Sequence, residues 1–356
     1  MEKANPSEST PPPTDHGNLG GLRYSFSASH NRRTEAGWAR EVTIRQFPIA
    51  TDIAGVNMRL GRGAVRELHW HKEAEWAYML YGSARITAVD TLDRHFVADV
   101  SEGDLWYFPS GIPHSIQALG DDGCEFLLAF DDGSFSEDST FLITDWLAHT
   151  PKDILGKNFA VPPSTFDKVP QKELYIFNAR MPGALQDDLA QSRQPVVPEP
   201  FNFRLHDVQP IETRGGRVRI ADSSNFKVSA TIAAALVEVE PGGLRELHWH
   251  PNADEWQYYI QGEARMTIFA SESRANTVDF SAGDVGYVPK SMGHYIENTG
   301  RTTLRFLELF RADRYEDVSL AGWMANTPAQ LVADHLKVDE QFLRSLPEKK
   351  HPVLPA

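Results

Sequence analysis

The chain has 356 residues, of which 41% are hydrophobic, and it carries a formal net charge of −14. This length accommodates two domains, each with its own hydrophobic core, and the composition is that of a globular protein. The negative charge argues against binding to nucleic acid or to an anionic membrane, because both need a basic surface.

The single cysteine, Cys124, excludes an internal disulfide, so we expect a fold that does not depend on an oxidising compartment. The N-terminal stretch lacks the apolar segment of a secretory signal, and no apolar run is long enough to predict a membrane span. We therefore expect a cytoplasmic protein that does not enter a membrane.

Residues 1–22 are rich in proline, serine and glycine, which predicts a disordered N-terminal arm. From residue 23 onward, short runs of β-branched and aromatic residues alternate with Gly, Asp and Pro, as is typical of a β-sandwich or β-barrel. Thr150-Pro151 then predicts a helix, with threonine as the N-cap and proline at the first helical position. We expect the first domain to cover residues 23–180.

Residues 181–200 contain several prolines and predict a linker, after which the same order of strands and helices repeats over residues 201–356. Thr327-Pro328 predicts a C-terminal helix in the same way as Thr150-Pro151. Matched residues stand 180 positions apart, namely Gly82 and Gly262, Gly103 and Gly283, and Phe130 and Phe310. An offset that stays constant over this span predicts an internal duplication of one β domain.

The string Arg-Glu-Leu-His-Trp-His occurs at residues 66–71 and again at 245–250. Two histidines separated by one residue lie on the same face of a strand, and a glutamate shortly afterwards can fold back beside them across a tight turn. A third histidine follows a turn that contains glycine or proline in each copy. The predicted ligand sets are His69, His71, Glu75 and His114 in the first copy, and His248, His250, Glu255 and His294 in the second.

Six of the 13 histidines therefore occupy matched positions, which favours metal binding over isolated core or surface histidines. Imidazole and carboxylate ligands suit divalent Mn, Fe, Ni, Cu and Zn, and the spacing does not choose among these metals. Four protein ligands leave two exchangeable positions at an octahedral metal, as a catalytic centre requires. Either copy could instead keep its metal for stability alone.

The metal-binding strings fit the two motifs of the cupin superfamily. In the first copy the matches are Gly63-x5-His69-x-His71-x3-Glu75-x6-Gly82 and Gly103-x5-Pro109-x-Gly111-x2-His114. In the second copy they are Gly242-x5-His248-x-His250-x4-Glu255-x6-Gly262 and Gly283-x5-Pro289-x-Ser291-x2-His294. The sequence therefore resembles a bicupin. This resemblance implies an all-β fold with helical caps, in which two cupin domains, each a β-barrel or jelly roll, stand in tandem.

Two longer strings, at residues 66–78 and 130–137, resemble the bacterial oxalate decarboxylases in particular. The resemblance implies an enzyme that splits oxalate into formate and carbon dioxide, with one Mn²⁺ in each cupin domain. It also implies that dioxygen is required as a co-catalyst without net oxidation. The assembly implied is a homo-hexamer formed by two trimers.

Arginine stands three residues before each histidine pair, as Arg66 and Arg245. Its fixed charge and paired donors suit a carboxylate substrate, and a bulge in the strand would bring it to the metal. The resemblance implies that Arg66 holds the substrate. Glu308 is a lone acid within an apolar run, which predicts either a second acid/base group or a partner for Arg245.

Residues 132–140 form a polar loop about three residues longer than its counterpart in the second copy, which predicts a mobile loop at the mouth of the first centre. The resemblance implies that this loop is a lid. It also implies that Glu137 handles the catalytic proton, which we expect it to take from monoprotonated oxalate and return to carbon. Asp138 adjoins Glu137, and its charge is expected to raise the pKa of Glu137 or to alter lid closure.

Three alternatives to a decarboxylase stay open. An oxalate oxidase would use the same metal and yield carbon dioxide and peroxide, but it would not need Glu137 to return a proton to carbon. A non-catalytic metal-binding bicupin is the second alternative, although seed storage bicupins usually lack the ligand histidines. The third is a cupin dioxygenase or isomerase for a larger substrate, which would differ in pocket volume.

Overall fold

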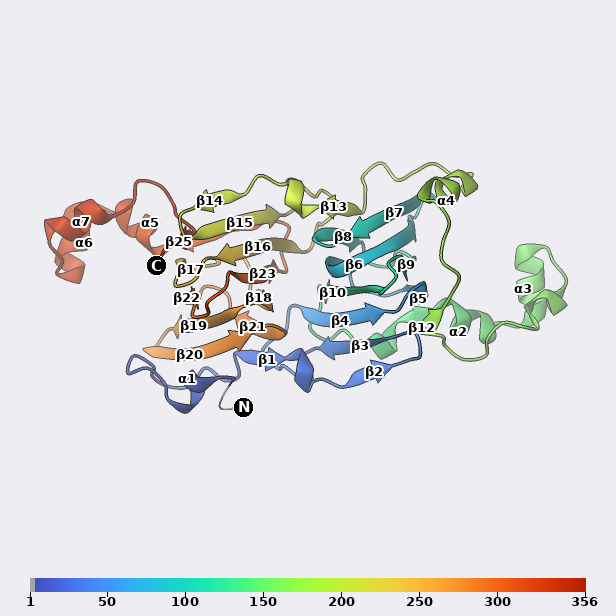
Figure 1. The fold of residues 1–356 in the computed structure, drawn as a ribbon, viewed down its shortest axis with the longest axis horizontal. Helices are drawn as coiled ribbons and strands as arrows, with labels where there is room; N and C mark the ends of the chain where they lie inside the picture. Colours follow the sequence, from blue (N-terminus) through green and yellow to red (C-terminus); the bar gives the residue numbers. More distant parts are fainter. Residues whose placement is uncertain (1–3) are drawn as a thin grey trace. The chain divides into compact units, whose positions relative to one another are not determined.

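The computed structural model describes residues 4–356, which form two compact units. The N-terminal unit contains residues 29–43 and 54–204, and the C-terminal unit contains the described residues up to 28 together with 44–53 and 205–356. Each unit consists mainly of β-strands with short helices at its margins (Figure 1). The prediction of an all-β fold with helical caps is therefore confirmed.

In the N-terminal unit most of the chain forms one twelve-stranded sheet. The strands are β2 (Asn31–Arg33), β3 (Gly37–Val42), β4 (Ala54–Leu60), β5 (Ala64–Trp70), β6 (Glu75–Val89), β7 (His95–Ser101), β8 (Asp104–Phe108), β9 (His114–Ala118), β10 (Cys124–Phe130), β11 (Phe141–Leu142), β12 (Ile176–Asn178) and β13 (Asn202–Arg204). The helices are α2 (Ile143–Ala148), α3 (Lys152–Phe159) and α4 (Leu185–Gln191), with short 3-10 helices η2 (Glu137–Ser139) and η3 (Pro163–Phe166).

The long strand β6 folds this sheet back on itself. Its first half pairs with β8 and β10, and its second half pairs with β7 and β9, all antiparallel. The chain bends at Gly82, which has φ of 76°, and a Cβ there would lie only 2.3 Å from the carbonyl oxygen of Gly123. Glycine is required because the backbone is left-handed and the neighbouring chain is close. The bend lets Trp106 and Phe126 pack inside, with ring centroids 5.3 Å apart.

The C-terminal unit repeats the design with two separate sheets. The strands are β1 (Arg23–Ser25), β14 (Ile211–Thr213), β15 (Gly216–Ala221), β16 (Ala233–Val239), β17 (Leu244–Trp249), β18 (Glu255–Gln261), β19 (Glu263–Ala270), β20 (Arg274–Ser281), β21 (Asp284–Val288), β22 (Gly293–Asn298), β23 (Leu304–Phe310), β24 (Val318–Ser319) and β25 (Val353–Leu354). The helices are α1 (Pro6–Ser9), α5 (Leu320–Ala325), α6 (Ala329–Leu336) and α7 (Glu340–Ser345), with 3-10 helices η1 (Phe26–Ala28) and η4 (Leu205–Asp207).

The sheet order in this unit is β1-β21-β18-β23-β16-β15-β14 for the larger sheet and β20-β19-β22-β17-β24 for the smaller one, with β25 also paired to β17. Tyr259, Ile268 and Phe306 are fully buried in its core. Among residues 4–356, no helix combines the length and the apolar character needed to cross a membrane.

The predicted boundaries at residues 23–180 and 201–356 differ from the compact units, because short segments join a unit distant in sequence. Strand β1 pairs with β21, and Figure 1 shows the two side by side. Strand β13 pairs with β8 of the N-terminal unit. A three-residue strand is stabilised by the sheet edge that it joins, and its own sequence does not identify that edge.

The predicted arm and linker also make specific contacts. Residues 1–3 of the arm lie outside the described residues. Within the rest of the predicted arm, 1–22, the amide of Ser7 donates to the Asp279 carboxylate at 2.7 Å. Within the predicted linker, 181–200, Asp188 of α4 accepts from buried Arg85 at 2.6 Å. The first contact ties part of the predicted disordered arm to β20, and the second ties the predicted linker to β6.

The predicted helices begin one residue later than expected. Pro151 and Pro328 occupy the N-cap positions of α3 and α6, so neither Thr150 nor Thr327 is the cap. Proline lacks an amide hydrogen, which is no loss at a helix start. Apart from this shift of one residue, both predicted helices are present.

Candidate metal centres

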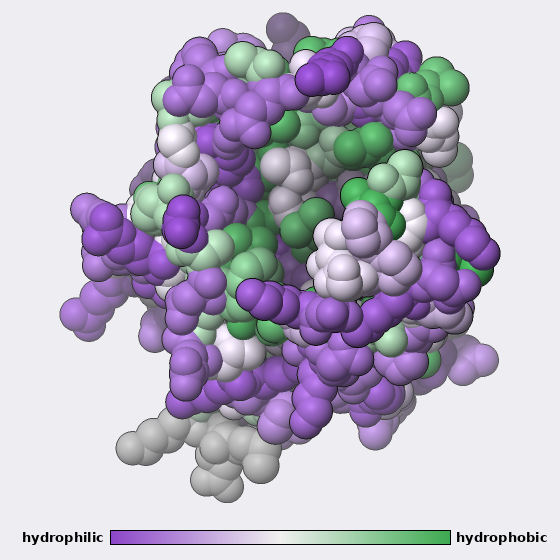
Figure 2. Space-filling model, turned by 90° about the vertical axis from the view of Figure 1, so that its right-hand side faces the viewer, coloured by the Kyte–Doolittle hydropathy of each residue, from purple (hydrophilic) through white to green (hydrophobic). Residues whose placement is uncertain are grey.

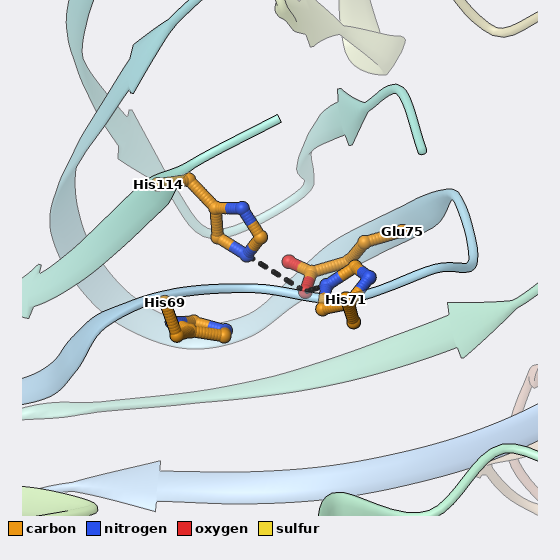
Figure 3. Close-up of side chains that lie close together, drawn as sticks. All are labelled: His69, His71, Glu75 and His114. Atoms are coloured by element: carbon orange, nitrogen blue, oxygen red, sulfur yellow. Dashed lines mark hydrogen bonds and ion pairs between the residues drawn. The ribbon is translucent and has the colours of Figure 1, made fainter. Parts of the chain in front are cut away.

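The first candidate centre forms where β5 ends and β6 begins. His69 lies in β5 directly opposite His114 of β9, while His71 follows β5 and Glu75 is the first residue of β6. The turn between the strands thus folds the glutamate back beside the histidine pair. All four side chains are buried, and Figure 3 shows His71 and His114 in contact with the Glu75 carboxylate.

The C-terminal unit repeats this arrangement. His248 of β17 pairs with His294 of β22, and Glu255 is the first residue of β18. Within each centre the four ligand atoms lie within 4.8 Å of one another. The structure therefore brings together both of the ligand sets predicted from the sequence.

Each ligand histidine is held by its Nδ1 atom. In the first centre the Nδ1 atoms of His69, His71 and His114 lie 2.5, 2.7 and 2.8 Å from the carbonyl oxygens of Glu67, Glu73 and Ile112. In the second, those of His248, His250 and His294 lie 2.7, 2.7 and 3.1 Å from the carbonyl oxygens of Glu246, Glu316 and Met292. Because a carbonyl can only accept, Nδ1 carries the proton and the Nε2 lone pair is free for a metal.

The buried Nε2 atoms have the surroundings of metal ligands. Those of His114, His248, His250 and His294 make no hydrogen bond, although the atoms of His250 and His294 lie 3.2 and 2.8 Å from Oε2 of Glu255. An imidazole lone pair and a carboxylate oxygen repel each other at this distance unless a cation or a proton lies between them. The donor set therefore fits a divalent transition metal in each centre.

In the first centre the electrostatic surroundings favour the protonation states that a metal needs at His69 and Glu75. Burial, and next the charge of Arg66, hold the pKa of His69 well below its ordinary value. Burial raises the pKa of Glu75, but His114 and His71 outweigh it, so the carboxylate stays ionised. Neutral imidazoles beside an ionised carboxylate are ready to bind a cation without first releasing protons. In the second centre burial acts against a proton on His250, but the Glu255 charge raises its pKa overall.

Arg66 belongs to a buried group beside the first centre. The β5–β9 pairing is irregular between Arg66 and His69, as the predicted bulge requires. Arg66 Nη2 lies 3.3 Å from Oε2 of Glu137, and the Tyr175 hydroxyl donates to the same oxygen at 2.8 Å. Burial, and next the Glu137 charge, raise the pKa of Tyr175, so its phenol stays protonated and remains a donor.

The loop that carries Glu137 lies against the first centre. Its Phe135 ring is 6.0 Å from the His71 ring and stacks on Phe130 at 3.6 Å. Asp138 is 79% exposed and accepts from Arg32 at 3.2 Å. The charge of Asp138 is therefore paired with an arginine and does not stand alone beside Glu137.

Comparison with known proteins agrees with these two centres. The Cupin family model matches residues 24–166 and 203–343. Oxalate decarboxylase OxdC of Bacillus subtilis is 58% identical over 353 residues, which cover 99% of this chain and 91% of the relative. A probable oxalate decarboxylase of Arthroderma benhamiae is 43% identical over 352 residues, covering 95% of this chain and 84% of the relative.

A solved structure of the Bacillus subtilis oxalate decarboxylase, from work on its Mn(II) centres, matches with a TM-score of 0.98 at 58% identity and covers 100% of this chain and 94% of the other. The chain belongs to the cupin family and, within it, to the oxalate decarboxylases. The two tandem cupin domains predicted from the duplication are therefore confirmed.

The second centre of this bicupin surrounds its arginine with fixed carboxylates. Arg245 Nε donates to Glu308 at 3.1 Å, and Nη2 donates to Asp317 at 2.9 Å and to the Tyr315 hydroxyl at 2.8 Å. Burial raises the pKa of Glu308 despite the opposing charge of Arg245. For Asp317 burial also acts upward, but Arg245 and Lys350 lower its pKa to about 2. The predicted pairing of Glu308 with Arg245 is present.

No spacing in the sequence marks Tyr175, Tyr315 or Asp317 as part of either site. Tyr175 lies far beyond both motifs and reaches Glu137 only because β12 returns to pair with β5. Tyr315 and Asp317 lie in the loop after β23 and meet Arg245 there. The unexplained acid in β23, Glu308, was the one usable signal for this network.

We predict that removing one carboxylate ligand empties one centre only. Glu75→Gln and Glu255→Gln should each lower the content from two divalent metal ions per chain to one, because each centre has its own complete ligand set. Metal analysis of the purified variants measures this content. Exposed Glu102→Gln is the matched control and should keep both ions. Loss of both ions from either ligand variant would contradict two independent centres.

Proposed function

We propose that this chain decarboxylates oxalate to formate and carbon dioxide, with Mn²⁺ in both centres and dioxygen as a co-catalyst. Full-length similarity to a named oxalate decarboxylase supports the activity, and the Mn(II) centres of that relative support the metal. The observation that carries the proposal is the buried contact of Glu137 with Arg66 beside the first ligand set.

The first centre would hold Mn²⁺ through the first ligand set, namely His69, His71, Glu75 and His114. Bound there, the ion would supply Lewis-acid and one-electron redox chemistry at its open positions. Arg66 would neutralise a substrate carboxylate, because guanidinium pairs well with that group. Glu137 would take the acidic proton of monoprotonated oxalate, and as the C–C bond breaks and carbon dioxide leaves it would return this proton to carbon, giving formate. Tyr175, by donating to Glu137, would keep the carboxylate oriented.

The alternatives fit these residues less well. An oxalate oxidase returns no proton to carbon, so it has no use for an acid such as Glu137 at 8% exposure beside Arg66. A storage-type bicupin has no need for two complete, buried ligand sets. A cupin that acts on a larger substrate needs open space where Phe135 is buried and stacks on Phe130.

We assign the second centre a structural role, or at most a minor catalytic one. The Arg245 side chain is fully buried, and its charge is already matched by Glu308 and Asp317. An arginine held in this way has no free charge for a substrate carboxylate. Glu308 and Arg245 therefore act as partners of each other and stand second to Glu137 and Arg66 as catalytic candidates.

We also propose the homo-hexamer of two trimers. Each unit exposes a large apolar side chain on its helical cap, with Trp146 of α2 at 65% and Trp323 of α5 at 60% exposure. Each tryptophan lines an apolar cavity, of about 310 Å³ beside Trp70 and about 470 Å³ beside Trp249. The face in Figure 2 is hollowed and gathers apolar residues within a hydrophilic rim. Such exposed patches suit contacts between subunits. The cytoplasmic location stays a prediction.

Replacing the lid acid tests the proposed reaction. Glu137→Gln should lower formate production at least about 100-fold, because it removes the proton carrier, while both manganese ions stay bound. Parallel formate and metal assays measure the two effects. Glu102→Gln, on the surface, should leave both unchanged. Formate production at the wild-type rate in the Glu137 variant would contradict the assignment of Glu137 as the proton carrier.

The two arginines should respond differently to the same change. Arg245→Gln leaves the buried Glu308 without its arginine and Asp317 with Lys350 alone, and should cost about 3–5 kcal/mol of unfolding free energy. Arg66→Gln should cost far less stability, because the lid can carry Glu137 into water, but it should slow formate production about 100-fold. Denaturant unfolding and formate assays on both variants check this. Equal losses of stability would contradict the asymmetry.

A further inference from the structure

Arg32, in the edge strand β2, contacts both the lid and the segment that leads into β12. Its Nη1 donates to Oδ1 of Asp138, in the lid, at 3.2 Å, and its Nη2 donates to Oε1 of Glu173. Its guanidinium carbon lies 3.7 Å from the centroid of the Tyr175 ring. Arg32 therefore joins the lid to the segment that leads into β12.

Tyr175 needs such support. Its backbone has φ of 58°, a left-handed conformation that is costly for a bulky residue. The guanidinium groups of Arg32 and Arg66 lie over its ring at 3.7 and 4.5 Å, and the electron-rich face of the ring attracts both cations. Arg32 therefore packs on the ring whose hydroxyl donates to Glu137.

We propose that Arg32 is a positioning residue that latches the lid over the first centre through its ion pair with Asp138. The inference rests on the proposed function of residues 132–140 as a lid. The ion pair between Arg32 and Asp138 would regulate the first centre, because closure of the lid brings Glu137 against Arg66.

A second contact holds the lid on the other side of Glu137. Phe135, two residues earlier, is buried and stacks on Phe130 at 3.6 Å. Asp138, one residue later, is held by its side-chain contact with Arg32. A lid held on both sides of Glu137 fixes the position of that carboxylate, whereas the apolar anchor alone would leave the later residues free to move.

The exposure of the ion pair suits a contact that breaks in each catalytic cycle. The side chains of Asp138 and Arg32 are 79% and 27% exposed. Ion pairs this accessible to water are weak and are screened by salt. The pair can therefore open to admit a small dicarboxylate and then re-form. Glu173 and Tyr175 keep the guanidinium in place while the lid is open.

Hydrogen–deuterium exchange of the lid amides, in full-length manganese-loaded protein without substrate, tests the latch. In the closed lid the amide of Ser139 donates to the Ser136 carbonyl at 2.9 Å, and the amide of Glu137 donates to Glu41 at 3.2 Å. Asp138→Asn should speed their exchange about two- to fivefold, the factor that corresponds to an exposed ion pair. Added salt should speed exchange in the wild type but not in this variant.

A double-mutant comparison assigns the effect to Arg32. Arg32→Gln should speed lid exchange at least as much as Asp138→Asn, and the double variant should be no faster than Arg32→Gln alone. The matched control is Arg33→Gln, the same change at the next, exposed position of β2. If Arg32→Gln folds poorly, the salt series on Asp138→Asn carries the test alone. Unchanged lid exchange in Asp138→Asn, or fully additive effects, would overturn the latch.

Formate assays on the same samples separate this inference from the proposed function. Asp138→Asn should lower kcat with its manganese content unchanged. If the wild type makes no formate but its lid exchange follows the predicted pattern, the decarboxylase proposal fails and the latch stands. If formate is made and neither Asp138→Asn nor salt alters lid exchange, the latch fails and the decarboxylase proposal stands.

Discussion

The hydrogen bond from each ligand histidine to a backbone carbonyl is the interaction on which both centres depend. It places the proton on Nδ1 and turns the Nε2 lone pair toward the shared glutamate. The grouping of the three histidines in each centre further requires that β5 and β17 keep their register against β9 and β22, because a slip of one residue would send the paired histidines to the other face. The fold therefore determines the donor set before any metal arrives.

The same scaffold gives its two arginines different partners. Arg66 faces one carboxylate, carried by a loop, and in the proposed reaction its charge becomes available when that loop moves. Arg245 faces Glu308, in a strand, and Asp317, which Lys350 also holds. A duplicated domain can thus separate two demands that conflict within one site, namely access for a charged substrate and stability of a buried ionic network.

Much of the site could be predicted because it is local in sequence. The spacing of two histidines and a glutamate within one hairpin predicts the ligand set, and the constant sequence offset between matched residues predicts the second copy. Arg32, Tyr175 and Asp317 could not be predicted, because they meet the centres through chain segments whose return path is set by packing. The pairing of β1 with β21 and of β13 with β8 could not be predicted either, since three residues carry too little pattern to identify a partner strand.

The most direct test is to incubate the manganese-loaded protein with oxalate in air at mildly acidic pH and to measure formate and hydrogen peroxide together. We predict formate in large excess over peroxide, because in the proposed reaction Glu137 returns the proton to carbon before the fragment can be oxidised further. Peroxide without formate, or neither product, would contradict a decarboxylase.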